Sequence, residues 1–362
     1  MKTRVVQMIP TLGSGGAERL VMDIVRYIDH SEFEVSLVSL YSKEQTAEIY
    51  RTFCSDHNIP IYYLNKKPGF DLRMLYKLVA LFRKLKPHAV HTHLYAGIYA
   101  VIPNLCCCIP VRLHTIHNVA ERELPAMHRK IMRWAYHHSG THPIAISPQV
   151  KKTIQEQYAL PSKKIPLICN GIDTMLYQRE KKIVESLETR YICVARFSPQ
   201  KNHAMLIEAF ASVKSQIANA KLYLVGGGEL EDQICAQVNQ LGLQESVILT
   251  GETSDVKQYL SSCDVFVMAS DYEGLPLSML EAMAMNLPVV STKAGGVVDI
   301  VTHGVEGYLV DIGDVQALAA NMITLQDRTL RELLGANARK RAEKYDIRCM
   351  VKRYERIYRS QK

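Results

Sequence analysis

The sequence predicts an α/β protein made of two doubly wound domains, each with a parallel sheet covered by helices. Short apolar runs alternate with helical patterns along nearly all of its 362 residues, and this alternation is typical of parallel sheets. A polar stretch without apolar periodicity, residues 174–189, separates two halves that repeat the pattern. The length is sufficient for two domains of ordinary size.

The first half is expected to begin with a strand, a glycine loop and a helix. Glycines allow a ligand to approach the backbone closely, and a helix N-terminus offers free N–H groups, so this arrangement can bind phosphate. The glycine spacing is not G-x-G-x-x-G, and an ordinary tight turn stays an open alternative. Strands are expected at residues 4–9, 33–40, 89–94, 111–118, 143–146 and 165–169, and helices at 70–85 and 125–139.

The second half repeats the alternation more regularly, and the chain ends in a helical segment. The domains are therefore predicted at 1–173 and 190–344, with a linker at 174–189 and a terminal helix within 345–362. Strands are expected at residues 191–195, 222–225, 247–250, 265–268, 288–291 and 307–310, and helices at 202–216, 314–325, 328–343 and 346–359.

Two carboxylates follow the strand predicted at 265–268. Glu273 is expected on the loop at the carboxyl end of that strand, and Glu281 in the first turns of the next helix, because Pro276 suits the first helical position. Ligands of open α/β sheets bind at this edge, and carboxylates are strong acceptors for sugar hydroxyls. The stretch is predicted to bind a nucleotide-sugar.

Other strand ends in the two halves carry groups that suit the same ligand. Arg196 and Lys201 follow one strand, Gly295 and Gly296 follow another, and His117 ends a strand of the first half. Glycine backbones and cations suit a pyrophosphate, whereas carboxylates suit hydroxyls. If the two domains face each other across a cleft, these groups form a site for a nucleotide-diphosphate sugar.

Charge and cysteine content limit the other function classes. Residues 1–180 carry 23 basic and 14 acidic side chains, residues 181–338 carry 11 and 19, and residues 339–362 carry 10 and 3. The basic first half suggests an anionic partner, yet no nucleic-acid motif occurs, and nucleic acid is not expected as a partner. Nine cysteines without a CxxC pair indicate reduced thiols in a cytoplasmic protein.

Taken in order, these motifs resemble the family-4 retaining glycosyltransferases, which have the GT-B fold of two Rossmann-like domains. The resemblance covers nearly the whole chain. It is carried by Gly13-Ser14-Gly15-Gly16-Ala17-Glu18, His114–Asn118, Asn170–Asp173, Arg196–Lys201, Val225–Gly228, Glu273-x7-Glu281 and Pro288–Gly296.

The resemblance implies a role for each matching position. Arg196 and Lys201 would bind the donor diphosphate and stabilise charge on the leaving group, which needs no metal ion, and no Asp-x-Asp motif occurs. Glu273 and His117 would contact the transferred sugar, and Glu281 the ribose. The further donor-binding residues would be Gly15, Gly16, Gly226, Gly251, Leu275, Pro276 and Leu277, with main-chain groups near Val247–Gly251 meeting the base.

The resemblance also implies a hexose donor, for which uridine diphosphate is preferred and guanosine diphosphate is second. The acceptor would be a cell-surface polysaccharide or glycolipid, bound by the basic first domain, and the terminal helix would return to that domain. His91 and His93 end a strand there and are weaker candidates for acceptor contacts; a purely structural role is the alternative. No cofactor is expected.

Basic, amphipathic helices are expected at 70–85 and 125–139, and such helices can bind an anionic membrane surface, here the inner face of the cell membrane. A buried apolar face with a solvated basic face is the alternative for both helices. Three other functions stay open: transfer to a small soluble acceptor, a non-catalytic nucleotide-sugar-binding protein, and a phosphorylase with a pyridoxal cofactor. The intact cations and glutamates count against the second, and the short chain counts against the third.

Overall fold

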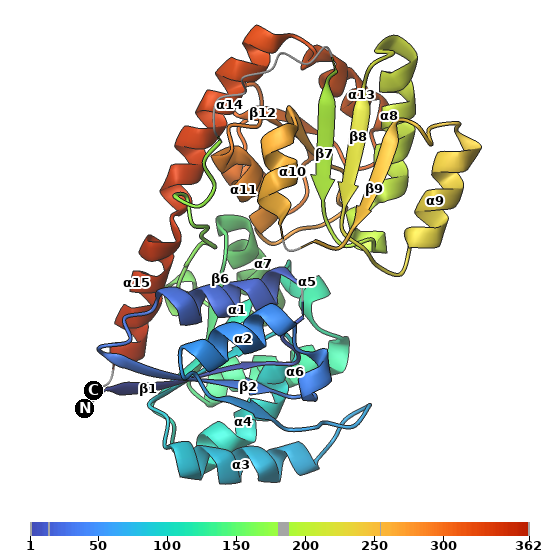
Figure 1. Cartoon of the computed structure of the whole chain (residues 1–362). Helices are drawn as coiled ribbons and strands as arrows, with labels where there is room; N and C mark the ends of the chain where they lie inside the picture. The colour runs from blue at the N-terminus through green and yellow to red at the C-terminus, as the bar shows by residue number, and fades with distance from the viewer. Residues whose placement is uncertain (1, 14, 180–187, 254, 361–362) are drawn as a thin grey trace. The chain divides into compact units, whose positions relative to one another are not determined.

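The computed structural model describes residues 2–13, 15–179, 188–253 and 255–360. They form two compact units, one of Met1–Gly171 with Ile347–Lys362 and one of Ile172–Asp346. Each unit contains a six-stranded sheet with helices around it (Figure 1). The prediction of two doubly wound α/β domains is confirmed. Within the predicted linker 174–189, residues 180–187 lie outside the described part of the chain.

The sheet of the first unit has the strand order β3-β2-β1-β4-β5-β6, and its strands pair in parallel. This is the doubly wound order, in which the connections from β1 and β4 run in opposite directions. The elements are β1 Thr3–Ile9, α1 Gly16–Tyr27, β2 Phe33–Ser39, α2 Glu48–Asp56, β3 Ile61–Tyr63, α3 Arg73–Leu85, β4 Ala89–His93, α4 Ala96–Cys106, β5 Val111–Ile116, α5 Ala120–Glu123, α6 Ala126–His138, β6 Thr141–Ala145, α7 Pro148–Tyr158 and α15 Ile347–Arg359.

The second unit repeats this topology with the order β12-β11-β10-β7-β8-β9, again with parallel pairs. Counted within the unit, β7 and β10 correspond to β1 and β4. The elements are β7 Arg190–Val194, the 3₁₀ turn η3 Pro199–Lys201, α8 His203–Gln216, β8 Lys221–Val225, α9 Glu231–Gln240, β9 Val247–Gly251, α10 Val256–Ser262, β10 Val265–Met268, α11 Leu277–Ala284, β11 Val289–Thr292, α12 Val297–Ile300, β12 Gly307–Val310, α13 Val315–Thr324 and α14 Arg328–Ala342.

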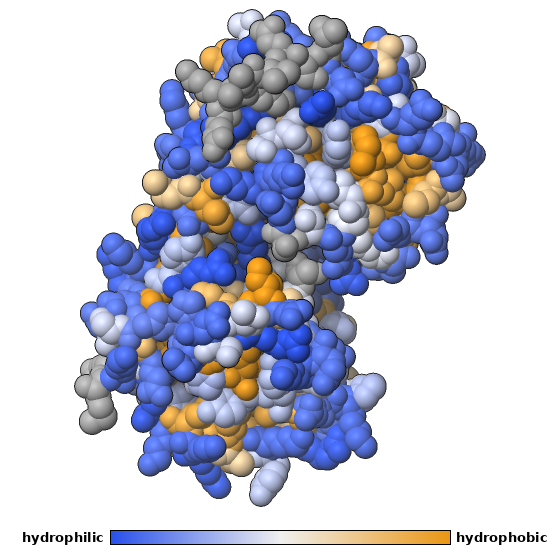
Figure 2. All heavy atoms as spheres, viewed as in Figure 1, coloured by the Kyte–Doolittle hydropathy of each residue, from blue (hydrophilic) through white to orange (hydrophobic). Residues whose placement is uncertain are grey.

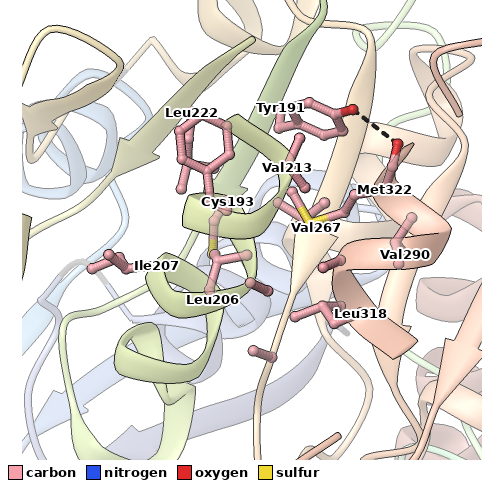
Figure 3. Close-up of a cluster of buried hydrophobic side chains, with 14 of the residues drawn as sticks. Tyr191, Cys193, Leu206, Ile207, Val213, Leu222, Val267, Val290, Leu318 and Met322 are labelled. Carbon is pink, nitrogen blue, oxygen red and sulfur yellow. Dashed lines mark hydrogen bonds between the residues drawn. The ribbon is translucent and has the colours of Figure 1, made fainter. Parts of the chain in front are cut away.

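One apolar core of the second unit lies between its sheet and the helices α8 and α13. Leu206, Ile207 and Val213 of α8 and Leu318 of α13 are buried against side chains of the strands (Figure 3). Tyr191 of β7 is also buried, and its hydroxyl donates a hydrogen bond to the backbone oxygen of Met322 at 2.8 Å. These contacts fix the positions at which the strands end, and hence the loops that follow them.

The last helix, α15, completes the core of the first unit although it follows the second unit in the sequence. It lies beside α1 (Figure 1) and buries Met350, Val351 and Tyr354. The hydroxyl of Tyr358 accepts a hydrogen bond from Gln7 Nε2 at 2.7 Å, inside the core. The backbone N–H of Asp29 donates to the carboxylate of Glu355 at 2.8 Å. The helix is therefore anchored by polar as well as apolar contacts.

Three local expectations differ from the structure. Residues 165–169 do not form a strand, and only Leu167 makes a single bridge to Ala145. The short strand β3 was not predicted, because its three residues are all half-buried and show no apolar run. The helix expected at 70–85 begins at Arg73, whose backbone N–H donates a hydrogen bond to the carboxylate of Asp71.

Within the described residues, no helix combines the length and the apolar character that crossing a bilayer requires. The face in Figure 2 is mostly hydrophilic, with separate apolar patches.

Candidate functional site

In the second unit, β7 and β10 are neighbours from which the chain departs in opposite directions, toward β8 and toward β11. The loops at their carboxyl ends therefore diverge, and open α/β sheets bind ligands at such a switch point. Arg196 and Lys201 lie on the loop after β7, and Glu273 lies on the loop after β10. The fold thus brings three of the predicted site residues to one edge of one sheet.

Lys201 and Glu273 form a direct ion pair at this edge. Lys201 Nζ donates to Glu273 Oε1 at 2.5 Å, and the exposed fractions of the two side chains are 19% and 6%. A charge-assisted hydrogen bond with so little solvent around it is strong and holds both side chains in one orientation. The pair leaves the second carboxylate oxygen of Glu273 available as an acceptor for a ligand hydroxyl.

The two loops are also joined through their backbones. The backbone N–H of Asp271 donates to Gln200 O at 2.9 Å, and Gln200 Nε2 donates to Tyr272 O at 2.8 Å. Asn202 Nδ2 donates to Asp271 Oδ1 at 3.0 Å, while Asn202 Oδ1 accepts from Met205 N at 3.2 Å and caps α8. These bonds fix the geometry of the ion pair before any ligand binds.

A glycine turn after β11 supports the backbone of Glu273. The N–H of Gly296 donates to Glu273 O at 3.3 Å. Gly295 has φ +52°, and a Cβ atom at this position would overlap the same carbonyl oxygen. Gly295 is therefore required by close backbone approach as well as by its conformation. Gly226 is similar, since it has φ +142° and a Cβ atom there would overlap the carbonyl oxygen of Ala195.

Arg196 differs from Lys201 in that its side chain reaches into solvent. It is 75% exposed, and Arg196 Nη2 lies 3.3 Å from Glu229 Oε2, whose side chain is 51% exposed. An exposed pair of this kind contributes little to stability. The guanidinium can therefore exchange this partner for an anionic ligand at small cost.

The remaining predicted donor residues of this unit lie around the same sheet edge. Pro276 precedes the first residue of α11, and Leu275 and Leu277 beside it are buried. Glu281 lies within α11 and is 2% exposed. Gly251 ends β9 and accepts a hydrogen bond from the N–H of Gly226 at 3.1 Å. Figure 2 shows hydrophobic surface over β8 and β9, and the residues of β9 after Val247 are only half-buried.

In the first unit, the predicted phosphate loop leads into the N-terminus of α1. Gly15 is the residue that precedes α1, Gly16 is its first residue, and both are exposed. Their N–H groups are available at the positive end of a helix of 12 residues. The arrangement can bind an anion.

His93 and His117 form a hydrogen-bonded chain with Gln7. Gln7 Nε2 donates to Tyr358, so Gln7 Oε1 accepts from His93 Nε2 at 3.0 Å. His93 Nδ1 must then accept from His117 Nε2, at 3.0 Å. This leaves Nδ1 of the half-buried His117 ring as an acceptor. Burial lowers the pKa of His117 to about 3, with a smaller contribution from His114, so the ring is neutral at physiological pH.

His91 is fully buried and belongs to the same core. Its Nδ1 accepts from the Tyr358 hydroxyl at 2.7 Å, and its Nε2 lies 2.7 Å from Thr115 Oγ1. The His93 ring is likewise without exposed surface. Burial lowers the pKa of both rings well below the usual histidine value. Neither ring offers a surface to an acceptor in this structure, in which both are hydrogen-bonded within the core.

Comparison with known proteins now decides the family. The model of the family described as Glycosyltransferase Family 4 matches residues 14–176, and that described as Glycosyl transferases group 1 matches residues 177–341. The chain is a family-4 glycosyltransferase. The solved structure of Anabaena Alr3699/HepE in complex with UDP and glucose has the same fold, with a TM-score of 0.84 and 22% identity over 98% of this chain and 99% of that one.

Two curated relatives show which reactions proteins similar to this glycosyltransferase catalyse. One is the UDP-Gal:alpha-D-GlcNAc-diphosphoundecaprenol alpha-1,3-galactosyltransferase of Escherichia coli, 24% identical over 92% of this chain and 90% of the relative. The other is the N-acetyl-alpha-D-glucosaminyl L-malate synthase of Bacillus anthracis, 26% identical over 82% of this chain and 81% of the relative.

Sequence reasoning missed several residues that hold the site of this glycosyltransferase together. Gln200 lies within the stretch Arg196–Lys201 and Asn202 directly follows it, but their partners are 72 and 69 positions away, respectively. Gln7 lies inside β1, and strand alternation does not reveal its histidine partner. No group of three or more His, Cys, Asp or Glu side chains that could hold a metal ion occurs in the described ranges.

Proposed function

We propose that this glycosyltransferase moves a hexose-type sugar from a nucleotide-diphosphate sugar with retention of the anomeric configuration. A UDP-sugar is the preferred donor and a GDP-sugar the second candidate. The observation that carries the proposal is the Lys201–Glu273 ion pair at the switch point between β7 and β10. A cation and a hydroxyl acceptor held together there suit the bond between a diphosphate and a sugar. UDP in the Anabaena structure supports the choice of base.

Each residue then has a task in the transfer. Arg196 and Lys201 bind the diphosphate and stabilise the negative charge that grows on the leaving nucleoside diphosphate, which is the work otherwise done by a metal ion. Glu273 holds hydroxyls of the transferred sugar, and Glu281 those of the ribose. The bond from the anomeric carbon to the phosphate oxygen breaks while the acceptor oxygen bonds on the same face. The hydroxyl proton passes to the leaving phosphate.

Three residues of the first unit, Gly15, Gly16 and His117, are also proposed to contact the donor. The backbone N–H groups of Gly15 and Gly16 bind the distal phosphate. Neutral His117 accepts a hydrogen bond from a hydroxyl of the donor sugar at Nδ1, because its Nε2–H is committed to His93.

The proposed acceptor is a cell-surface polysaccharide or a lipid-linked saccharide. The Escherichia coli relative, whose acceptor is a diphosphoundecaprenol-linked sugar, supports this choice. The Bacillus anthracis relative makes a malate conjugate and supports a small soluble acceptor as the second candidate. A protein that binds the donor without transferring the sugar is the remaining alternative.

A lipid-linked acceptor suggests that the enzyme works in the cytoplasm, at an anionic membrane surface. The helix α6 carries exposed Met127 and Trp134, at 68% and 50% exposure. Lys130 and Arg133 lie with Trp134 along one shallow surface hollow. Exposed apolar and basic side chains on one helix suit an interface with anionic lipid.

The donor is tested by a thermal-shift panel of UDP, GDP and their hexoses, repeated with a metal chelator. UDP and a UDP-hexose should raise the unfolding temperature, since about 100-fold excess over the dissociation constant contributes about 2.7 kcal/mol. The chelator should leave both binding and turnover unchanged. If neither UDP nor GDP raised the unfolding temperature, the proposed donor would be contradicted. Loss of turnover on chelation would contradict metal independence.

The membrane is tested by sedimentation with vesicles of phosphatidylglycerol and phosphatidylcholine. Binding should require the anionic lipid, weaken with added salt and fall in the Trp134→Ala variant. Absence of binding at low salt would rule out the membrane surface while leaving the donor chemistry intact.

A further inference from the structure

Loops after four strands of the first unit, β2, β3, β4 and β5, line a second pocket. Its volume is about 420 Å³, within the range of about 300–1,000 Å³ that is usual for small-molecule sites. It lies at the carboxyl edge of the sheet, because Tyr41 follows β2, Lys66 follows β3, Tyr95 follows β4 and Glu123 ends α5 after β5. None of these residues belongs to the donor site described above.

The pocket has an aromatic wall that is held in place from behind. The rings of Phe70 and Tyr99 stack with centroids 5.3 Å apart and planes 19° apart. Phe70 is 57% exposed, so its other face is open to a ligand. The Tyr99 hydroxyl contacts the backbone of the same loop, where it accepts from Asp71 N at 3.2 Å. The wall is therefore formed before a ligand arrives, which lowers the entropic cost of binding.

Lys66 stabilises this loop and is not a free cation. Lys66 Nζ donates to Gly69 O at 2.6 Å, to Lys67 O at 2.9 Å and to the Tyr41 hydroxyl at 3.4 Å. Its three N–H donors are thus directed at protein oxygens, so none is left for a ligand phosphate, and the Glu123 carboxyl in the same lining disfavours an anion. The ligand chemistry that the pocket favours is accordingly neutral.

Polar groups in the pocket indicate a ligand that carries hydroxyls. The Glu123 carboxylate accepts a hydrogen bond from His117 N at 3.2 Å, which places the pocket next to the residue proposed to contact the donor sugar. Burial raises the pKa of Glu123 to about 7. His128 Nδ1, a buried atom, makes no hydrogen bond within the described part of the chain. A buried polar atom of this kind calls for a partner.

We propose that this pocket binds a neutral pyranose ring of the acceptor saccharide, with one face of the ring on Phe70 and a hydroxyl hydrogen-bonded to Glu123. The C–H groups on one face of a pyranose are weakly positive and match the negative face of an aromatic ring. A lipid chain is less suitable, since Leu124 and Pro125 are the only aliphatic residues in the lining. The proposal rests on the proposed sugar transfer, because it assigns the acceptor of that reaction.

Saturation-transfer NMR with a panel of methyl glycosides tests the pocket directly. The glycosides of glucose, galactose, mannose, N-acetylglucosamine and N-acetylgalactosamine are added at millimolar concentration with UDP present to occupy the donor site. At least one should bind, and Phe70→Ala should weaken its binding about tenfold, roughly the effect of one good stacking contact. The matched control is Tyr76→Ala, since Tyr76 is an aromatic residue of α3 that is 79% exposed. This variant should bind the glycoside as the wild type does.

Two further variants distinguish a binding role from a structural one. Phe70→Tyr should restore binding, since it keeps the ring, and Glu123→Gln should weaken binding without lowering the unfolding temperature by more than a few degrees. Equal saccharide binding by wild type, Phe70→Ala and Glu123→Gln would overturn the proposal, as would no binding of any glycoside. The UDP-induced thermal shift should be the same in every variant. If UDP caused no thermal shift in the wild type, the proposed donor would be contradicted instead. The NMR signal of saccharide binding does not depend on that shift.

Discussion

Lys201 Nζ lies 2.5 Å from Glu273 Oε1, although the two residues are 72 positions apart in the sequence. The contact arises because β7 and β10 are adjacent in the sheet while the chain leaves them in opposite directions. The loops between which a ligand of this fold binds are thus joined by an ion pair.

Replacing Glu273 by Gln should lower turnover by about a hundredfold or more, in the range found when one group that stabilises a transition state is removed. Gln keeps the shape of the side chain but not the charge that orients Lys201, so UDP should still bind. Initial rates and UDP-induced thermal shifts measure the two effects. Glu208→Gln, at an exposed position of α8, is the control. Near-normal turnover of Glu273→Gln would remove Glu273 from the chemistry.

Replacing Lys201 by Ala should be more harmful to stability than replacing Arg196 by Ala. Loss of Lys201 leaves the carboxylate of Glu273 buried and unpaired, and breaking a buried pair typically costs about 3–5 kcal/mol. Arg196 is 75% exposed, so its loss should affect mainly UDP binding and turnover. Urea unfolding compares the two variants, and equal free energies of unfolding would count against the structural role of the pair.

Gly295→Ala should lower both stability and turnover, because the new Cβ atom would overlap the carbonyl oxygen of Glu273. Gly313→Ala is a matched control, since Gly313 also has positive φ but has nothing within 4 Å of an added Cβ. The control should lose about 1–2 kcal/mol from backbone conformation alone and keep full turnover. If both variants behaved alike, the turn would not position Glu273.

The hydroxyl of Tyr358 should anchor α15 to the first unit. Tyr358→Phe leaves Gln7 and His91 without this buried partner, and each unsatisfied group costs about 1–3 kcal/mol. Tyr76→Phe, at an exposed position of α3, should change stability little. Thermal unfolding measures both, and an unchanged Tyr358→Phe variant would show that α15 is held by its apolar face alone.

Acid should unfold the first unit before the second. Burial lowers the pKa of His114 to about 3 and that of His91 and His93 well below the usual value of about 6.5. Below pH 6.5 the unfolded chain binds protons that the folded unit does not, so stability is complete above pH 6.5 and falls toward pH 3. Each buried histidine contributes a slope of about 1.4 kcal/mol per pH unit.

Hydrogen exchange of the backbone between pH 7 and pH 5 checks this order. Protection should be lost first in β4 and β5, where these histidines lie. In the second unit, burial lowers the pKa of His203 to about 4, which is a smaller source of acid instability. Loss of protection in β7 and β8 at a higher pH than in β4 would contradict the prediction.

The sequence was informative about the fold because apolar runs and loop residues are local signals. The strands after which Arg196 and Glu273 stand were predicted within one or two residues of their bounds. The histidines are a case in which local signals were insufficient. The end of β4 was predicted, but the sequence did not indicate that His91 and His93 point into the core beneath α15. Only the packing of a helix more than 250 positions away decides that.

The acceptor pocket proposed here had no sequence signal. Phe70, Tyr99 and Glu123 come from separate segments with no motif in common, and only the parallel order of the strands brings those segments to one edge. The pairing of Lys201 with Glu273 is similar, since each residue was predicted to bind the donor but their direct contact depends on the strand order.

The proposed transfer with retention is tested most directly by NMR of the product that the wild-type enzyme forms from a UDP-hexose with an α-configured anomeric carbon. The acceptor is a lipid-diphosphate-linked saccharide, and Glu273→Gln is run in parallel. We expect release of UDP, a product with the α configuration and a loss of rate in the variant. A β-configured product, or equal rates for the two proteins, would contradict it.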